Sequence, residues 1–215
     1  MTDPYLLLTP VLALAVLALA RFVGCDRLFG LRRVPDEPDL PDPPAEIPFV
    51  ESFVLGQPRN NVMNPFTGWA GMQIHVGATP LTVTQLGRIM RTGSTIPHEV
   101  KIVERAGPSS GIDRGMVTIP PSAAVPPTAT NPGFAYATLQ PAVFLTANTD
   151  YYVLSHEDGT SSDEWHNVDG TVATADVAQV TEGAFSPDAD PDVYQRLGGP
   201  GNTYGPVDFI YQEPA

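Results

Sequence analysis

The sequence has a single cysteine and few basic residues, and both shortages limit what the protein can do. Because Cys25 is the only cysteine among 215 residues, the chain cannot form an internal disulfide, and cysteine usage indicates no redox compartment. Only 11 Lys and Arg residues oppose 24 Asp and Glu residues, which gives a net charge of −13. Residues 34–215 hold seven of the basic and 22 of the acidic residues, a net charge of −15. Such an acidic segment repels nucleic acid, so we expect no nucleic-acid partner.

The sequence also lacks recognisable catalytic motifs. None of the four histidines belongs to an H-x-x-x-H or H-E-x-x-H pattern, and no serine has a G-x-S-x-G context. The glycine-rich segment 198–202 does not join a strand to a helix, as a phosphate-binding loop would. We therefore predict a protein that is not an enzyme and that holds no organic cofactor.

One long hydrophobic run is present, and it lies in residues 1–33. The uncharged residues from Tyr5 to Ala20 would span about 24 Å as a helix, less than the roughly 30 Å of a bilayer core. Continuing to Cys25 makes up the length, because the Arg21 side chain can reach the headgroups. We predict one transmembrane helix, since Leu and Ala cover every face of it. The expected interface residues are Tyr5, Arg21, Arg27 and Phe29.

Two other interpretations of this run remain open. A cleaved signal peptide needs a basic segment before the hydrophobic run, and Met1–Pro4 has no basic side chain. A lipoprotein would be lipidated at Cys25, which follows a suitable Gly24, but Phe22 is a poor residue for that motif and Arg21 interrupts its apolar approach. We favour an uncleaved anchor.

Residues 34–48 predict an extended tether. Their sequence, VPDEPDLPDPPAEIP, has six prolines and five acidic residues, a composition that excludes a helix or a central strand. Polyproline II geometry, at about 3.1 Å per residue, is expected instead. The tether would act as a spacer or as a strap along a partner protein.

Residues 49–215 predict one β-rich domain. With 24 prolines and 19 glycines in the chain, short β-branched and aromatic runs alternate with turn residues, and no convincing helical pattern follows Phe49. This spacing favours a mainly β fold, an antiparallel β-sandwich of jelly-roll type. The expected strands are residues 68–77, 81–91, 99–104, 115–119, 134–139, 142–145, 150–155, 170–180 and 207–211.

Several phrases of this domain resemble a β-sandwich module of bacterial envelope and secreted proteins, whose function is poorly characterised. The phrases are TGWAGMQIHVGATPLTVTQLGR (67–88), HEVKIVE (98–104), LQPAVFLTANTDYYVLSHE (139–157), DEW (163–165) and YGPVDFIY (204–211). Some proteins of this kind look like carbohydrate-binding modules, so the resemblance implies a sandwich fold and leaves glycan binding open. The proline-rich segment 120–132 and the anchor depart from the pattern.

Two acidic loops are candidate metal sites. Asp188, Asp190 and Asp192 alternate as in a calcium loop, although the glycine and the closing acid of an EF-hand are missing. Residues 156–158 and 163–166, with Asp169, could supply oxygen and nitrogen ligands as well. An acidic surface loop is the simpler interpretation of both.

Two aromatic residues are candidates for contact with a partner or ligand. Trp165 lies among polar residues and Tyr204 follows the glycine-rich segment, whereas Trp69 sits in an alternating strand and is expected in the core.

These features support two functional hypotheses. The first is an accessory subunit that stabilises a larger bacterial membrane complex, of photosynthetic or respiratory type, through its helix and tether; alanines along the helix permit close helix contacts. The alternative is a membrane-anchored surface module that binds glycan. We expect the bacterial inner membrane as the location. The arginines after the helix favour a cytoplasmic domain, whereas the envelope resemblance favours the periplasm, which we prefer.

Overall fold

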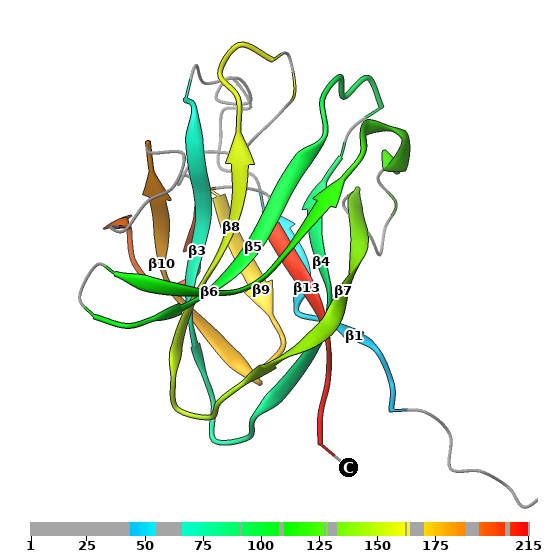
Figure 1. Ribbon diagram of the computed structural model, residues 1–215. Helices are drawn as coiled ribbons and strands as arrows, with labels where there is room; N and C mark the ends of the chain where they lie inside the picture. The colour runs from blue at the N-terminus through cyan, green and yellow to red at the C-terminus, as the bar shows by residue number, and fades with distance from the viewer. Residues whose placement is uncertain are drawn as a thin grey trace, which may run out of the picture. The chain divides into compact units, whose positions relative to one another are not determined.

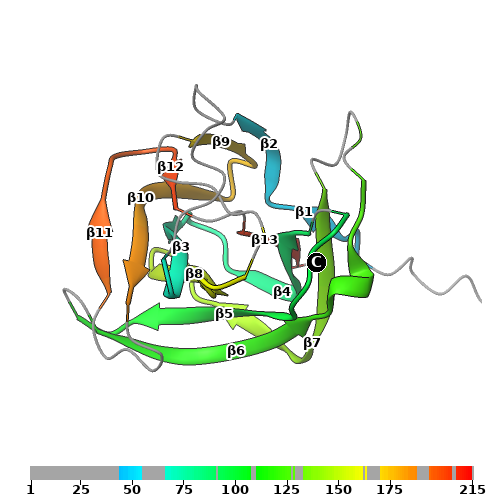
Figure 2. The same cartoon turned by 90° about the horizontal axis from the view of Figure 1, so that it is seen from above.

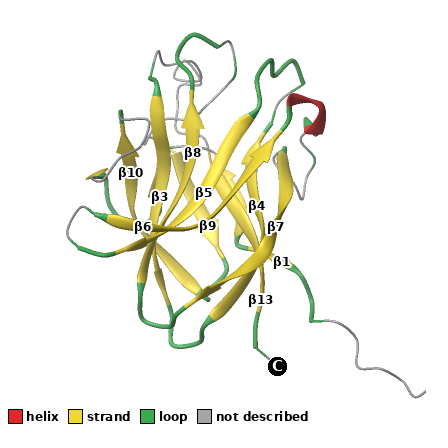
Figure 3. Ribbon diagram, viewed as in Figure 1, coloured by secondary structure: helices red, strands yellow, loops and turns green. Residues whose placement is uncertain are grey.

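A computed structural model of the chain describes residues 44–54, 66–90, 92–107, 110–126, 128, 133–161, 163, 170–187, 194–204 and 207–214 (Figures 1 and 3). The chain divides into two units, Met1–Pro43 and Pro44–Ala215, and only the second contains described residues. The predicted transmembrane helix therefore lies outside them. No helix in the described ranges is long and apolar enough to cross a membrane.

The second unit is mainly β, as the sequence predicts, and its strands pair antiparallel. One 3₁₀ turn, η2 (Pro121–Ala123), lies among the described residues. The strands are β1 (Ile47–Pro48), β2 (Val50–Val54), β3 (Gly68–Val76), β4 (Leu81–Ile89), β5 (His98–Arg105), β6 (Gly111–Ile119), β7 (Phe134–Leu145), β8 (Asp150–Glu157), β9 (Gly170–Thr174), β10 (Ala178–Ser186), β11 (Gln195–Leu197), β12 (Asn202–Thr203) and β13 (Val207–Gln212).

The strands form two main sheets and a small third one (Figure 2). The four-stranded sheet has the order β1-β13-β4-β7, and the six-stranded sheet has the order β11-β10-β3-β8-β5-β6. A three-stranded sheet, β12-β9-β2, completes the unit. Most ladders join strands that are distant in sequence, so the sheets depend on long-range pairing.

The main core lies between the two larger sheets. Alternate residues of β3, such as Met72 and Ile74, point into it and meet Leu81 and Val83 of β4. Each of these side chains is fully buried, and burial of one large aliphatic side chain contributes about 1.5–3 kcal/mol. The period-two pattern in the sequence thus selects the faces that come together.

The strand predictions are confirmed for most of the domain, with differences where small residues or proline blur the pattern. Residues 134–139 and 142–145 form the single strand β7, which continues through Pro141 because β7 is at a sheet edge, where a missing N–H is tolerated. Residues 170–180 form two strands instead of one, β9 and β10. The short strands β2, β11 and β12 had no distinct signal.

The end of the predicted tether forms the edge strand of the four-stranded sheet. Ile47 and Pro48, which the sequence pattern assigns to the tether, pair with β13 as strand β1. The Phe49 ring stacks on Phe209 with centroids 4.6 Å apart, and the Phe49 N–H donates to the Phe209 carbonyl at 2.9 Å. The sandwich therefore begins before Phe49.

A buried carboxyl group fixes this attachment. Asp208, Gly87 and Tyr136 are direct neighbours across β13, β4 and β7. Because Gly87 has no side chain, the Tyr136 ring lies over it, and the Tyr136 hydroxyl donates to Asp208 Oδ2 at 2.6 Å. Asp208 Oδ1 accepts the Val50 N–H at 2.8 Å and the Phe209 N–H at 2.7 Å.

Burial changes the acidity of both side chains of this pair. Asp208 is fully buried, and loss of solvation raises its pKa to about 7 despite the hydrogen bonds it accepts. Burial and the neighbouring Asp208 also raise the pKa of Tyr136 far above its usual value, so Tyr136 remains a donor. Asp208 thus titrates near neutral pH inside the fold.

Candidate functional site

A group of polar residues lies on the face of the six-stranded sheet that points away from the main core. On β3, Gln73 and His75 alternate with the core residues Met72 and Ile74 and so point to the opposite face. Tyr152 on β8 lies on the same face, directly across from Gln73 in the β3–β8 ladder. We call this surface the outer face.

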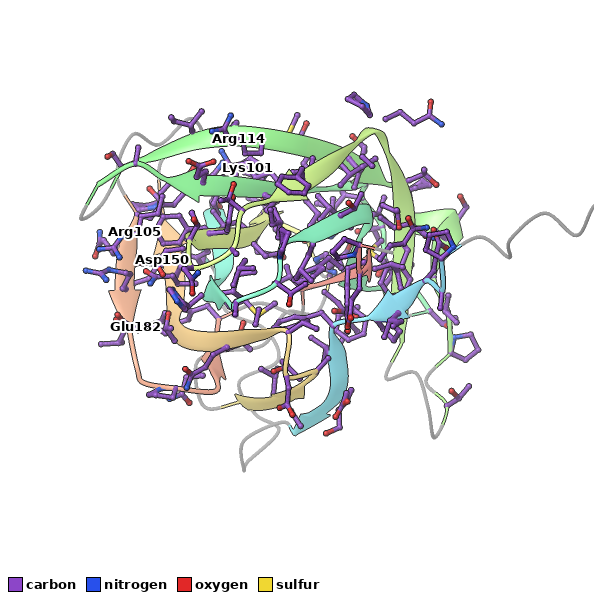
Figure 4. The ribbon with its side chains drawn as sticks, turned by 90° about the horizontal axis from the view of Figure 1, so that it is seen from below. Lys101, Arg105, Arg114, Asp150 and Glu182 are labelled. Atoms are coloured by element: carbon purple, nitrogen blue, oxygen red, sulfur yellow. The ribbon has the colours of Figure 1, made fainter. Side chains whose placement is uncertain are left out.

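A triad of Arg105, Asp150 and His75, joined by hydrogen bonds, occupies one end of the outer face. Asp150 receives the Arg105 guanidinium at 2.6 Å and lies 2.7 Å from Nδ1 of His75. Burial opposes ionisation of Asp150, but the hydrogen bonds from His75 and Arg105 prevail and lower its pKa. Figure 4 shows Arg105 and Asp150 beside each other, and a depression of about 480 Å³ lies against the triad. Its lining residues are His75, Arg105, Ala106, Gly107, Asn148, Thr149 and Asp150.

Along the strands from this triad, two buried polar atoms have no hydrogen-bond partner among the described residues. They are Oε1 of Gln73, a residue 3% exposed, and the hydroxyl of Tyr152, which is 0% exposed. Burial raises the pKa of Tyr152, and the charges of Arg105 and Arg196 act against the shift. Arg196 itself binds Glu182 at 3.3 Å.

A cluster of Lys101, Trp69 and Tyr194 lies in the middle of the outer face. Lys101 Nζ lies 4.3 Å from the Trp69 ring centroid and 5.7 Å from that of Tyr194, and it contacts both carboxylate oxygens of Asp113 at 3.2 Å. The Tyr194 ring in turn packs on Tyr152 with centroids 4.8 Å apart. The prediction that Trp69 is buried is confirmed, although it packs in this second cluster and not between the main sheets. Because these rings are buried, none of them offers a free face for stacking.

A second surface lies where β6 and β7 form the edges of the two main sheets. Arg114 binds Glu104 at 2.7 Å, and Ile112 is the cross-strand neighbour of Glu104. Ile112 is 49% exposed and Phe144 is 60% exposed. A shallow depression of about 350 Å³ is lined by Glu104, Arg114 and Phe144 among others. We call Glu104, Ile112, Arg114 and Phe144 the edge patch.

A buried ionic cluster joins the two main sheets. Arg88 of β4 points across the core and contacts both carboxylate oxygens of Glu157 on β8, at 3.1 and 2.7 Å. It also donates to the Ser155 hydroxyl at 3.1 Å and to the Ile89 carbonyl at 2.7 Å. The charges of Arg88 and Glu157 therefore compensate each other inside the protein, and we interpret this ion pair as structural.

His98 extends this cluster to the loop after β8. Its Nδ1 lies 3.0 Å from the His156 carbonyl and its Nε2 lies 3.0 Å from Asp163 Oδ2, so both ring nitrogens face oxygen atoms. Burial alone would raise the pKa of Asp163, but hydrogen bonds from His98 and from the Thr95 and Ile96 backbone lower it. Asp163 is thus held as a carboxylate.

The structure describes only part of the sequence-predicted metal sites. The calcium candidates Asp188, Asp190 and Asp192 lie outside the described residues. In the second candidate, Glu157 and Asp163 are occupied by Arg88 and His98. Within the described ranges, no group of three His, Cys, Asp or Glu residues is arranged to hold a metal ion.

Of the two aromatic candidates, only Tyr204 is described. Its ring is 8% exposed and packs edge-on against Phe185 with centroids 5.0 Å apart, so little of it is available to a partner. Trp165 lies outside the described residues, as do the expected membrane-interface residues Tyr5, Arg21, Arg27 and Phe29.

The polar residues of the outer face were not singled out from the sequence. The alternation in β3 and in residues 98–105 indicates which side chains leave the core, but it does not show that Arg105 meets Asp150, 45 residues later. That juxtaposition depends on the pairing of β5 with β8.

Comparison with known proteins adds no relative: no protein-family model, no curated protein and no solved structure matches the chain.

Proposed function

We propose that this chain is a single-pass bacterial membrane protein without enzymatic activity, whose β-sandwich is an accessory subunit of a larger membrane complex. In this proposal the helix within residues 1–33 anchors the chain in the inner membrane. The tether gives the domain its reach, on the periplasmic side of the membrane. The host complex is of photosynthetic or respiratory type.

The edge patch is the observation that carries this proposal. Phe144 is 60% exposed and lines a depression with Glu104 and Arg114, which form an ion pair, and the 49% exposed Ile112 is the cross-strand neighbour of Glu104. Protein interfaces commonly combine an apolar centre with a polar rim, and exposed apolar side chains gathered in one place mark such contacts. Ile112 and Arg114 of the patch lie on β6 and Phe144 lies on β7, which are edge strands of the two main sheets.

The strand order supports the jelly-roll interpretation of the domain. The pairs are nested: β1 pairs with β13, β3 with β8, β4 with β7, and β5 with β6. This is the pairing of an eight-stranded antiparallel ribbon folded into two Greek keys. Strands β9 to β12 are then an insertion before the last strand. Jelly rolls serve in capsids and lectins as assembly and binding domains, which agrees with the proposal.

The proposal is tested by purifying the full chain from native membranes with an affinity tag after Ala215. Mild detergent, native-size analysis and mass spectrometry would identify the companions. We expect a stoichiometric complex with the unmodified chain and its loss with Phe144→Ser. Met116→Ser is the matched control, because Met116 is 53% exposed on β6 but lies opposite Lys101, away from the patch. A monomer-sized particle would contradict the proposal, and equal recovery with both variants would exclude the edge patch as the contact.

A second candidate function, a membrane-anchored surface module that binds glycan, is favoured by a different region. The outer face holds a polar depression of about 480 Å³, lined by His75, Arg105 and Asp150 among others. The two functions use separate residues, so separate variants distinguish them.

A further inference from the structure

Asp208 is a carboxyl group buried on the side of β13 that faces away from the main core. Its chain neighbours Val207 and Phe209 point into that core, so Asp208 points to the opposite face of the four-stranded sheet. It is nevertheless 0% exposed. Its hydrogen bonds join it to the Tyr136 hydroxyl of β7 and to the N–H of Val50, where the chain passes from β1 into β2. The segment that joins β1 to β2 therefore lies against a carboxyl group.

The groups that contact Asp208 carry no positive charge. Its donors are the Tyr136 hydroxyl at 2.6 Å and the N–H groups of Val50 at 2.8 Å and Phe209 at 2.7 Å. None of the lysine, arginine and histidine side chains that the structure describes forms an ion pair with it. A negative charge on Asp208 would therefore meet neutral dipoles only.

The charged groups on the neighbouring elements do not compensate Asp208. Arg88 of β4 is the cross-strand neighbour of Val207, so it lies on the core side of the sheet, where it binds Glu157 at 2.7 Å. Tyr136 is the titratable residue that β7 presents, and it stays protonated because burial and Asp208 raise its pKa. The other titratable groups on the adjoining described segments are acidic and exposed: Glu46, Glu51, Asp176 and Glu213.

Ionised Asp208 is thus a buried charge without a counter-ion, which is an unfavourable state. The neutral hydrogen bonds offset only part of the lost solvation, and the pKa accordingly rises to about 7. Contact with water would restore the solvation. The part of the enclosure with the fewest pairings is the N-terminal one, because β1 has two residues paired with β13, whereas β7 has twelve residues and pairs along β4.

We propose that Asp208 and the segment Ile47–Val50 form a proton-controlled clasp, which holds the start of the sandwich in place in acidic surroundings and opens as the pH rises toward neutrality. The closed clasp keeps a proton that the open clasp releases between pH 3.8 and about pH 7. The open fraction should therefore grow about tenfold per pH unit in this window and stay constant above it. The clasp is independent of both candidate functions, because it uses neither the edge patch nor the outer face.

The test is amide hydrogen exchange of the full chain, measured residue by residue from pH 4 to pH 8.5 and corrected for the intrinsic pH dependence of exchange. The reporters are the N–H groups of Phe49, which donates to the Phe209 carbonyl, and of Val50, which donates to Asp208. We expect their protection to fall about tenfold per pH unit up to about pH 7. At each pH it should be lower than the protection of β3 and β8, because the clasp opens without the rest of the sandwich.

Two variants and a matched control assign the effect to Asp208. Asp208→Asn cannot ionise, so the protection of Phe49 and Val50 should no longer depend on pH through this side chain, and at pH 8 their exchange should be about tenfold slower or more. Tyr136→Phe removes a hydrogen bond that lowers the pKa of Asp208, so the fall in protection should extend to higher pH. The control is Asp163→Asn, which alters another buried acid.

Asp163 also accepts backbone N–H groups, those of Thr95 and Ile96. Its variant should speed exchange at these two residues and leave the pH dependence at Val50 unchanged. Exchange of Phe49 and Val50 at the same rate as β3 and β8 at every pH would overturn the clasp, because the segment would then open only with the whole sandwich. The same pH dependence in the unmodified chain and in Asp208→Asn would overturn it as well.

Discussion

The raised pKa of Asp208 predicts that the sandwich loses stability as the pH rises toward neutrality. Unfolding returns Asp208 from a pKa of about 7 to the ordinary value of 3.8. Between these two values the folded chain keeps a proton that the unfolded chain releases, so the free energy of unfolding falls with increasing pH. The shift is about three pKa units, which corresponds to a total loss on the order of 4 kcal/mol at 1.36 kcal/mol per unit.

Asp208→Asn isolates this effect. The amide oxygen can still accept the Val50 and Phe209 N–H groups, and the amide nitrogen can donate to the Tyr136 oxygen. The free energy of unfolding of this variant should therefore depend on pH through every titrating group except Asp208. Urea unfolding of the full chain, followed by fluorescence of the buried Trp69 at several pH values from 4 to 8.5, measures the difference.

We expect the free energy of unfolding of the asparagine variant, relative to that of the unmodified chain, to rise between about pH 4 and about pH 7 and then to stay constant. Tyr136→Phe sharpens the test. The Tyr136 hydrogen bond lowers the pKa of Asp208, so its removal should extend the slope to higher pH. Parallel pH profiles for the unmodified chain and Asp208→Asn would refute the reasoning, because they would mean that Asp208 ionises equally in both states.

Three further predictions concern other described residues. Arg88→Met should destabilise the fold by about 3–5 kcal/mol in denaturant unfolding, because it leaves the carboxylate of Glu157 buried without its partner. Gly87→Ala should cost about 1–3 kcal/mol in the same assay, since the new methyl group would lie 2.5 Å from the Tyr136 ring. Asp163→Asn should unfold at a lower temperature than the unmodified chain at pH 6. The two melting temperatures should converge as the pH falls through the lowered pKa of Asp163, because the carboxylate contributes stability only while it is ionised.

The sequence predicts the architecture better than it predicts the site. Strands with a strict period-two pattern, such as β3 and β5, appear within a residue or two of their predicted bounds. Strands such as β11 and β12 have two or three residues and no pattern of their own, and they are defined by their pairing with β10 and β9. A local sequence pattern cannot predict a strand that is defined only by its pairing with another segment of the chain.

The candidate site depends on the same long-range pairing. Alternation shows that Gln73 leaves the core, but it does not show that Tyr152 lies opposite, or that Oε1 of Gln73 has no hydrogen-bond partner among the described residues. The reverse holds for Arg88, which the β4 pattern would place among apolar residues and which is buried only because Glu157 reaches it from the other sheet. Charge compensation between sheets has no signature in a single segment.

The attachment of the Phe49 segment has a mechanical consequence. Any tension on the chain before Pro44 reaches the sandwich first through β1 and then through the Phe49 ring stacked on Phe209. The next restraint is the Val50 N–H bond to Asp208, a side chain in the middle of the four-stranded sheet. Pulling on the tether therefore acts first on β1, the two-residue edge strand, and then on β13, the strand beside it. Since Asp208 changes its charge near neutral pH, the force that this anchor point withstands should vary with the acidity of the compartment.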